Sequence, residues 1–207
     1  MFIYHIIIEY DGTNFVGWQI QKNGLSIQGA IQKTLTKVLK QKIIVYGSGR
    51  TDSGVHAHAQ SAHFISKTKI NNNFFFLNTI NFFLNKKKIS ILNINIKKKT
   101  FHARYSAKKR FYRYIIVNRI APLSIDTNKA WHLKFTLDVK LMKKAAKILE
   151  GTKDFSTYRS SSCGAKSPFR TLEKVTVIKN GSKIAITFKS KSFLQQQVRS
   201  MVGCLKF

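Results

Sequence analysis

The segment GSGRTDSGVHA at residues 47–57 has the clearest potential for chemistry in this chain. Its three glycines permit positive φ angles and a close approach of the backbone to a ligand. Between the glycines stand one cation, Arg50, and one carboxylate, Asp52. Two interpretations are open. The segment is either a tight β-turn in which Asp52 forms an Asx-turn, or a loop that holds Asp52 as a nucleophile or general base.

The histidines and cysteines do not form a metal-binding pattern. His56 and His58 lie in or beside this segment, but no third ligand stands at a suitable spacing. We therefore expect both histidines to pack against the loop or to lie at the surface. Cys163 and Cys204 form neither a C-x-x-C pair nor a disulfide framework. The sequence thus predicts no metal site, zinc ribbon or disulfide scaffold.

Net charge is the second indication of function. The chain of 207 residues carries 37 Lys and Arg against 8 Asp and Glu, a formal net charge of +29 at pH 7. There are too few carboxylates to pair with the cations, which indicates a polyanionic partner and first of all a nucleic acid. An AT-rich coding bias is an alternative source of part of the lysine excess. The runs Lys86–Lys88, Lys97–Lys99 and Lys108–Arg110 are either solvated surface or phosphate contacts.

Neither apolar stretch of the sequence is typical of a targeting or membrane segment. The N-terminal MFIYHIIIEYDG has no basic region ahead of its apolar residues and runs into Glu9 and Asp11, unlike a signal peptide. The stretch FFFLNTINFFL at 74–84 is interrupted by Asn78 and Asn81 and is too short to span a bilayer. We expect a soluble, cytoplasmic protein without membrane contact. At 43% hydrophobic residues it can bury a core.

The elements that position residues 47–57 follow from the periodicity of the first half. The β-branched run Ile3–Ile8 predicts a strand. Ser26 is a typical N-cap residue, and apolar residues recur after it at helical spacing to about residue 40. Further strands are predicted at 43–46, 59–65 and 89–96, and a second helix at 72–84. The order β-α-β-β-α-β is the split βαβ pattern.

The second half repeats this order. Strands are predicted at 110–117, 175–178 and 184–188, and the last two flank the hairpin signal Asn180-Gly181. Asp138 caps a helix that Gly151 ends as a C′ residue. Apolar residues from Phe193 to Leu205 recur at helical spacing, and the sequence predicts no strand after them.

We therefore expect an α+β fold of two tandem ferredoxin-like (split βαβ) repeats with mainly antiparallel sheets. The first repeat is predicted at 1–106 and carries the GRTD loop. The second, at 107–207, lacks its final strand and should leave a sheet edge unpaired.

Five ordered blocks of the sequence share their motifs with one family. The blocks are EYDGTNFVGWQIQ at 9–21, GRTDSGVHA at 49–57, FHARYSAKKRFYRYIIVN at 101–118, EGTKDFSTYRS at 150–160 with SPFRTL at 167–172, and FLQQQVRSMVG at 193–203. They are distributed along nearly the whole chain, from residue 9 to residue 203, and chance does not supply five such blocks in order. The chain resembles the tRNA pseudouridine synthase A (TruA) family, as a member shortened at its C-terminus.

The resemblance implies an isomerase that converts uridine to pseudouridine in the tRNA anticodon stem-loop, at positions 38–40, without a metal or cofactor. In that family the aspartate of the G-R-T-D motif attacks, or assists departure at, the ribose of a flipped uridine. The C1′–N1 bond breaks, the uracil turns in place, and C5 is joined to C1′. The position that matches this aspartate is Asp52. The resemblance also implies tRNA as partner and a homodimer.

Three other residues match family positions with a role. Arg50 matches an arginine that fills the gap left by the extruded base, whose flipping costs a few kcal/mol. Tyr112 matches a tyrosine that stacks on the target base. Arg199 matches an arginine that pairs with the catalytic carboxylate, which here would join the two halves. By type alone, Tyr112 is more typical of a core aromatic and Arg199 of a snorkelling surface cation. Trp18 is expected to be a packing residue.

The sequence departs from the family mainly in its last helix. Residues 195–197 are all Gln where the family often has histidines and a methionine, and Ser200 replaces an Asn. Two alternatives to an active synthase stay open. One is a catalytically inactive tRNA-binding remnant of the same fold. The other is a basic structural component of a ribonucleoprotein, for which 47–57 is only a turn. The presence of all four matched residues favours the enzyme.

Overall fold

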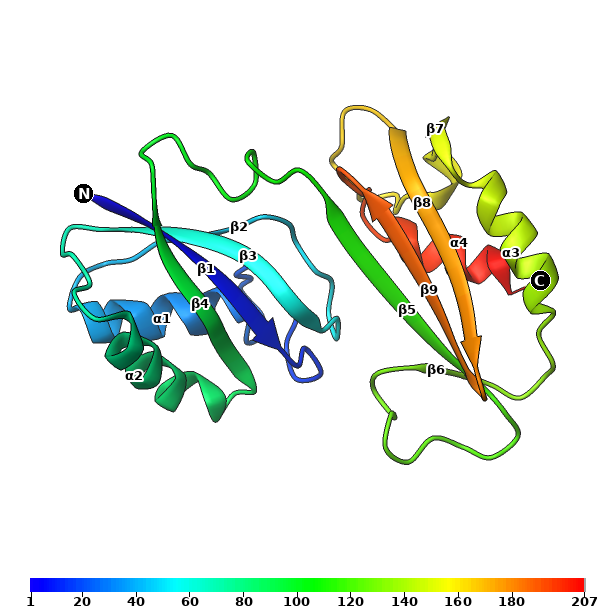
Figure 1. The fold of residues 1–207 in the computed structure, drawn as a ribbon, viewed down its shortest axis with the longest axis horizontal. Helices are drawn as coiled ribbons and strands as arrows, with labels where there is room; N and C mark the ends of the chain where they lie inside the picture. The colour runs from blue at the N-terminus through cyan, green and yellow to red at the C-terminus, as the bar shows by residue number, and fades with distance from the viewer. Residues whose placement is uncertain (207) are drawn as a thin grey trace. The chain divides into compact units, whose positions relative to one another are not determined.

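The computed structural model describes residues 1–206, and the chain divides into two compact units, Met1–Ala107 and Lys108–Phe207 (Figure 1). Both units combine helices with a mainly antiparallel sheet, as the sequence predicts. Within residues 1–206 no helix has both the length and the hydrophobicity that crossing a bilayer requires.

The first unit is a four-stranded sheet with two helices on one face. Its elements are β1 (Phe2–Tyr10), α1 (Ile27–Leu39), β2 (Val45–Gly47), β3 (Ala57–Ser66), α2 (Asn73–Asn85) and β4 (Ile89–Lys97). The sheet order is β2-β3-β1-β4, and every neighbouring pair is antiparallel. The predicted element order is confirmed, with bounds within two residues of those expected.

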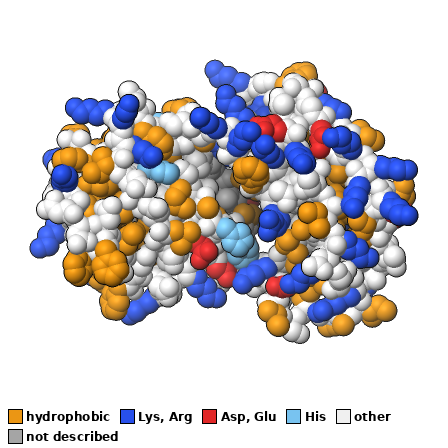
Figure 2. All heavy atoms as spheres, in the orientation of Figure 1, with side chains coloured by type: hydrophobic (Ala, Val, Ile, Leu, Met, Phe, Trp, Pro, Cys, Tyr) orange, Lys and Arg blue, Asp and Glu red, His pale blue; other side chains and the backbone are white. Residues whose placement is uncertain are grey.

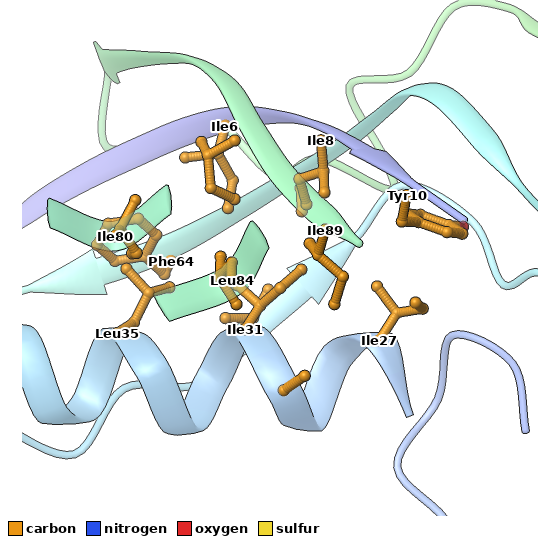
Figure 3. Close-up of a cluster of buried hydrophobic side chains, with 14 of the residues drawn as sticks. Ile6, Ile8, Tyr10, Ile27, Ile31, Leu35, Phe64, Ile80, Leu84 and Ile89 are labelled. Atoms are coloured by element: carbon orange, nitrogen blue, oxygen red, sulfur yellow. The ribbon is translucent and has the colours of Figure 1, made fainter. Parts of the chain in front are cut away.

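Alternation along the strands and helical periodicity bring one apolar face together (Figure 3). Ile6 and Ile8 of β1 point toward the helices, where Ile31 of α1 and Leu84 of α2 meet them in the same buried cluster. Burying such a side chain stabilises the fold by roughly 1.5–3 kcal/mol. Ser26 caps α1 as predicted, since its Oγ accepts a hydrogen bond from the Gly29 N–H at 3.2 Å.

The opposite face of this sheet carries a cluster of histidine and aromatic rings. His5 of β1 lies across from His63 of β3, and Tyr46 of β2 stacks on His63 at a centroid distance of 5.1 Å. The segment after β4 folds over this face. Its Phe101 ring lies 5.1 Å from His5, and its His102 ring lies 4.6 Å from His63.

His63 is held neutral by this packing. Its side chain is only 3% exposed. The pKa of His63 is lowered from 6.5 to about 4, mainly by burial and next by His102, while a backbone hydrogen bond with Tyr46 opposes the shift. The Ala103 N–H donates to His63 Nδ1 at 3.2 Å, which requires that nitrogen to be unprotonated.

The second unit is a five-stranded sheet in the order β6-β5-β9-β8-β7. Its elements are β5 (Arg110–Asn118), β6 (Trp131–Leu133), α3 (Val139–Ile148), β7 (Gly151–Asp154), the 3₁₀ helix η1 (Ser156–Tyr158), β8 (Phe169–Asn180), β9 (Lys183–Ser190) and α4 (Gln197–Leu205). All neighbouring strands are antiparallel except β5 and β6, which are parallel. Helices α3 and α4 contribute to one buried cluster with Phe188 of β9.

Several details of this unit differ from the sequence prediction. Strands β6 and β7 were not predicted, because β6 has three residues and the four residues of β7 are all exposed. Asn180 pairs with Lys183, so the hairpin loop is Gly181-Ser182 and not Asn180-Gly181. Gly181 has φ +55, which suits the first position of a type II′ turn.

The helix ends of this unit also need correction. Asp138 caps α3 as predicted, since its Oδ1 accepts from Lys140 N–H at 2.8 Å and from Leu141 N–H at 3.1 Å. Gly151 is not the C′ residue of α3, however. The helix ends at Ile148 with Leu149 as C-cap, and Gly151 opens β7 with φ +97. Helix α4 begins at Gln197, after the apolar Phe193 and Leu194.

Strand β5 is paired on one side along only part of its length. In the described residues, Ile116–Asn118 pair with β6, whereas Arg110–Ile115 pair with β9 alone. No strand follows α4 up to Lys206. The expected unpaired edge is therefore found over the first two-thirds of β5.

The packing of His63 predicts an acid-sensitive fold. Because its pKa is lowered in the folded state, the unfolded chain binds a proton first as the pH falls below 6.5. The free energy of unfolding should be constant above pH 6.5 and should fall by up to about 3 kcal/mol as the pH approaches 4. Chemical denaturation at pH 7.0, 5.5 and 4.5 measures this dependence.

Two variants separate His63 from the other titrating groups. His63→Gln should reduce the pH dependence between 6.5 and 4.5, and the part that remains includes His5, whose pKa burial also lowers. His58→Gln, at an exposed position on the same strand, should leave the pH dependence unchanged. Equal slopes for the wild type and His63→Gln would contradict the assignment.

Candidate active site

The GRTDSGVHA loop lies where β1 ends and β3 begins. Tyr10 of β1 pairs with Ala57 of β3, so the chain that leaves β1 and the chain that enters β3 emerge at the same end of the sheet. This register places the segment 11–18 against the loop 48–56, although the two are about 40 residues apart in sequence. Two of the sequence motifs thus form a single structural unit.

Glycines allow the two backbones to touch. A Cβ on Gly12 would lie 2.0 Å from the carbonyl oxygen of Val55, and a Cβ on Gly17 would lie 2.6 Å from the carbonyl oxygen of Thr51. Gly17 also has φ +112, which side-chain-bearing residues rarely adopt. Any larger residue at either position would push the loop away from segment 11–18.

Hydrogen bonds fix the loop on both sides of Arg50. The Trp18 N–H donates to the Thr51 carbonyl at 3.0 Å, and the Tyr10 hydroxyl lies 2.8 Å from Thr51 Oγ1. On the other side, Gln60 Nε2 donates to the Gly49 carbonyl at 2.7 Å. The position of the Arg50 backbone is therefore set by contacts at both neighbouring residues.

The chain turns sharply at Asp52. The Val55 N–H donates to the Asp52 carbonyl at 3.2 Å, and Gly54 has φ +74. Ser53 Oγ donates to the Phe15 carbonyl at 3.1 Å, which ties this turn to the facing segment. Asp52 is half-buried in this turn, whereas Arg50 is exposed. The two interpretations of this segment, a tight turn and a loop that holds a catalytic Asp52, are therefore compatible. The turn fixes the backbone from which the Asp52 carboxylate projects.

His56 packs the loop, as predicted. Its Nδ1 lies 3.2 Å from the Gly12 amide nitrogen and 3.1 Å from Asp11 Oδ1. The nitrogen accepts from the amide when unprotonated and donates to the carboxylate when protonated. The pKa of Asp11 is lowered below its usual value, mainly by hydrogen bonds from Thr13 and to a smaller extent by the charges of His56 and Lys88. Burial of the carboxylate opposes this shift.

The other residues near the loop have structural positions. Trp18 is 3% exposed, its ring lies 6.2 Å from that of Tyr10, and a Cβ on Gly47 would lie 2.6 Å from the indole. The predicted packing role of Trp18 is confirmed. His58 is exposed on β3. In the part of the chain that the structure describes, no group of three or more His, Cys, Asp or Glu residues could hold a metal ion.

Tyr112 and Arg199 lie on adjacent elements of the second unit. Tyr112 of β5 stands opposite the fully buried Phe188 of β9, and its half-buried ring meets Phe193 edge-on at 5.0 Å. Arg199 is exposed in the first turn of α4, a helix that packs against β5. The structure therefore brings Tyr112 and Arg199 to neighbouring elements, as it brings Arg50 and Asp52 to one loop. The pairing of Arg199 with Asp52 stays a prediction.

The glutamine run before Arg199 has a structural use. Gln196 adopts φ +60 immediately before the helix. Gln197 is fully buried, and its Oε1 accepts from the Leu194 N–H at 2.8 Å, which closes the loop that leads into α4. Its Nε2 has no hydrogen-bond partner within the described chain. A polar residue thus occupies a core position at the start of α4.

The electrostatic setting favours a polyanion. Figure 2 shows Lys and Arg side chains over the visible face of each unit, with few Asp or Glu. Among the described residues, lysines form ion pairs with the carboxylates of Asp11, Asp126, Glu150 and Glu173. With 8 acidic residues against 37 cations, internal pairing leaves most of the positive charge for solvent or a partner.

Comparison with known proteins identifies the family. A family model described as tRNA pseudouridine synthase matches residues 6–106 and 145–207. The chain belongs to the tRNA pseudouridine synthase family. It is 56% identical to tRNA pseudouridine synthase A of Pelagibacter ubique over 207 residues, which are 100% of this chain and 84% of that relative. Identity to tRNA pseudouridine synthase A of Neorickettsia sennetsu is 44% over 202 residues, 98% of this chain and 83% of the relative.

A third relative is matched over a similar share of its length. The tRNA pseudouridine synthase A of Afipia carboxidovorans is 44% identical over 202 residues, which are 98% of this chain and 82% of the relative. The expected family resemblance is confirmed by all three matches. The sequence did not identify Gly12 of segment 11–18 or Thr51 of the loop as positioning residues. The glycine-rich character of both motifs was the available signal, but only the β1–β3 register pairs Gly12 with Val55.

The contact between Gly17 and Thr51 predicts a strong effect of a single methyl group. Gly17→Ala should lower the free energy of unfolding by roughly 2–4 kcal/mol, through its φ and its clash with the Thr51 carbonyl. It should also abolish the protection of the Trp18 amide in native-state hydrogen exchange, because that amide donates to Thr51.

Gly54→Ala is the matched control. Gly54 also has a positive φ, but a Cβ there would meet nothing within 4 Å. This variant should cost only about 1–2 kcal/mol and should keep the Trp18 amide protected. Equal effects of the two substitutions would mean that the segment 11–18 does not position the loop.

Proposed function

We propose that this protein isomerises uridine to pseudouridine in the anticodon stem-loop of tRNA. The observation that carries the proposal is the immobilised GRTD loop, in which Gly12 and Gly17 let the backbone of residues 11–18 hold Asp52 and Arg50 in a fixed turn. Membership of the tRNA pseudouridine synthase family and the formal charge of +29 support it. The relatives' printed name supplies tRNA as the substrate class.

In the proposed reaction the Asp52 carboxylate acts at the ribose of the target uridine. The C1′–N1 bond breaks, the uracil turns, and a C5–C1′ bond forms. C5 then loses its proton, and N1 ends protonated, so that the product is an isomer of the substrate and no redox partner is needed. A half-buried carboxylate on a fixed backbone suits this role, because positioning contributes a large part of such a rate enhancement.

Arg50, Tyr112 and Arg199 complete the proposed site. Arg50 is exposed two residues before Asp52, where its side chain can fill the gap that the extruded uridine leaves. Tyr112 would stack on the flipped base, and its placement beside Phe193 supports the ring from one edge. Arg199 would pair with Asp52 through its guanidinium group. Its exposure on the first turn of α4 supports this assignment.

The finer features of the family belong to the same proposal. We infer that the two units are ferredoxin-like repeats, 1–106 and 107–207. The order β2-β3-β1-β4 of the first unit supports this, since β3 lies between β1 and β2 as a split βαβ unit requires. We also infer a homodimer, from the family resemblance, and a cytoplasmic location, from the tRNA substrate.

Asp52→Asn should abolish pseudouridine formation while tRNA affinity stays within a few-fold of wild type. The physical reason is that many phosphate contacts carry binding, and loss of one carboxylate removes none of them. Pseudouridine is quantified by mass spectrometry after incubation of unmodified tRNA with purified protein, and affinity is measured by fluorescence anisotropy.

Glu9→Gln is the matched control, because it neutralises an exposed carboxylate on β1, at a position that pairs with Ser90 of β4. It should leave turnover unchanged. Wild-type turnover by Asp52→Asn would remove Asp52 from the reaction. Tight tRNA binding without any wild-type turnover would identify the inactive tRNA-binding remnant instead.

Affinity for tRNA should fall steeply with salt. Each phosphate that a lysine or arginine neutralises releases counterions, so the logarithm of the binding constant should fall linearly with the logarithm of salt concentration. Binding titrations between about 50 and 200 mM salt should lose roughly 10³-fold or more if six or more phosphates are contacted. A flat dependence would show that the lysine excess is compositional and does not report the interface.

A further inference from the structure

Tyr105 is a large aromatic side chain left at the surface of the first unit. It is 78% exposed, although it stands in the motif FHARYSA, between the cation Arg104 and Ser106. The roles proposed above do not use it. Its exposure is notable because Ala103, two residues before it, is only 1% exposed and packs the segment against the sheet.

The ring is supported from beneath. His102 lies 4.5 Å from the Tyr105 centroid at an interplanar angle of 37°. His102 in turn lies 4.6 Å from the buried His63, which stacks on Tyr46 at 5.1 Å. Four rings from β2, β3 and the segment after β4 thus form a continuous ladder, which we call the ring ladder, with Tyr105 as its solvent-facing end.

Backbone hydrogen bonds hold the outer end of the ring ladder in place. The Ser106 N–H donates to the His102 carbonyl at 2.8 Å, and the His102 N–H donates to Ser106 Oγ at 3.1 Å. The Arg104 N–H donates to His102 Nδ1 at 3.2 Å. Tyr105 is therefore presented from a closed turn, and little conformational entropy remains to be lost when a ligand stacks on it.

The surroundings of this ring are cationic. The Arg104 guanidinium lies 6.0 Å from the Tyr105 centroid, and Lys97 lies 5.9 Å from the ring of Phe101. The sequence has no Asp or Glu between Asp52 and Asp126, a stretch that contains fourteen Lys and Arg. An aromatic face among cations, without a carboxylate on the same stretch of chain, is complementary to a nucleotide, whose base stacks while its phosphate is neutralised.

We propose that Tyr105 is a stacking platform for an unpaired nucleotide of the tRNA substrate. This inference rests on the proposed function, since it takes tRNA as the ligand. The nucleotide's base would lie on the exposed face of Tyr105, and Arg104 would contact an adjacent phosphate. The nucleotide bound here is distinct from the target uridine, because the proposed base-stacking residue for that uridine is Tyr112.

Stacking and phosphate contacts give different signatures. Base–aromatic stacking contributes about 1–3 kcal/mol per base, so Tyr105→Ala should weaken tRNA binding by roughly 5- to 150-fold. Stacking releases no counterion, so the slope of log affinity against log salt should stay at the wild-type value. Arg104→Ala should instead reduce the magnitude of that slope by about 1.

The experiment measures binding of an unmodified tRNA transcript to the full chain by fluorescence anisotropy at several salt concentrations. Tyr105→Phe keeps a stacking ring and should bind within about two-fold of wild type. Phe74→Ala is the matched control, since Phe74 is also exposed, at 68%, and also contacts another ring, but lies on α2 on the helical side of the sheet. It should not change affinity. Thermal unfolding of each variant verifies that the fold is retained.

The outcomes separate this proposal from the proposed function. Wild-type affinity for Tyr105→Ala, or an equal loss for Tyr105→Phe, would overturn the platform and leave the Asp52→Asn test untouched. A loss of tRNA affinity for Tyr105→Ala together with a changed slope of log affinity against log salt would also overturn the platform, because phosphate contacts would then account for the lost affinity. A wild-type chain that does not bind tRNA would overturn the proposed function, and the platform with it.

Discussion

The contact between segment 11–18 and the loop 48–56 is the constraint on which the candidate active site depends. Two backbones approach so closely that Gly12 and Gly17 have no room for a Cβ. Because this approach is steric, it does not weaken with salt or pH, and hydrogen bonds such as that from Trp18 to Thr51 then set the direction of the chain. The backbone positions of Arg50 and Asp52 follow from this contact.

The core of the first unit makes that contact possible. The register that places Tyr10 opposite Ala57 is specified by alternation, since a shift by one residue would turn Ile6 and Ile8 away from the helices. The same alternation sends His5 and His63 to the opposite face. One strand pair therefore builds the hydrophobic core on one side and, on the other, a ring cluster that the segment 98–106 covers.

Charge and packing perform separate tasks in this protein. The lysines are mostly at the surface and supply a long-range attraction for a polyanion that carries no sequence information. Selectivity must come from groups whose geometry is fixed, and these are the GRTD loop and the aromatic rings. Gln197 shows that such local geometry has an energetic cost, because its polar side chain is buried and its Nε2 has no hydrogen-bond partner among the described residues. Its Oε1 accepts from the Leu194 N–H and so fixes the loop that precedes Arg199.

The sequence by itself determined the elements of the first unit, because apolar alternation and caps such as Ser26 are local signals. It also determined the family, because motifs in a fixed order can be recognised without a structure. The roles of Asp52, Arg50, Tyr112 and Arg199 stay predictions from those motifs.

Only the tertiary structure decided the features that arise from pairing between distant segments. Strand β7 has no buried face and is defined by its hydrogen bonds to β8, so no hydrophobic period could reveal it. The role of Gly17 depends on a carbonyl 34 residues away, at Thr51, and the ring ladder joins Tyr46, His63 and Tyr105 across strands. Local sequence determines which secondary structure each segment favours and which of its faces is apolar. Which residues meet is decided by strand register, and register is a property of the folded sheet.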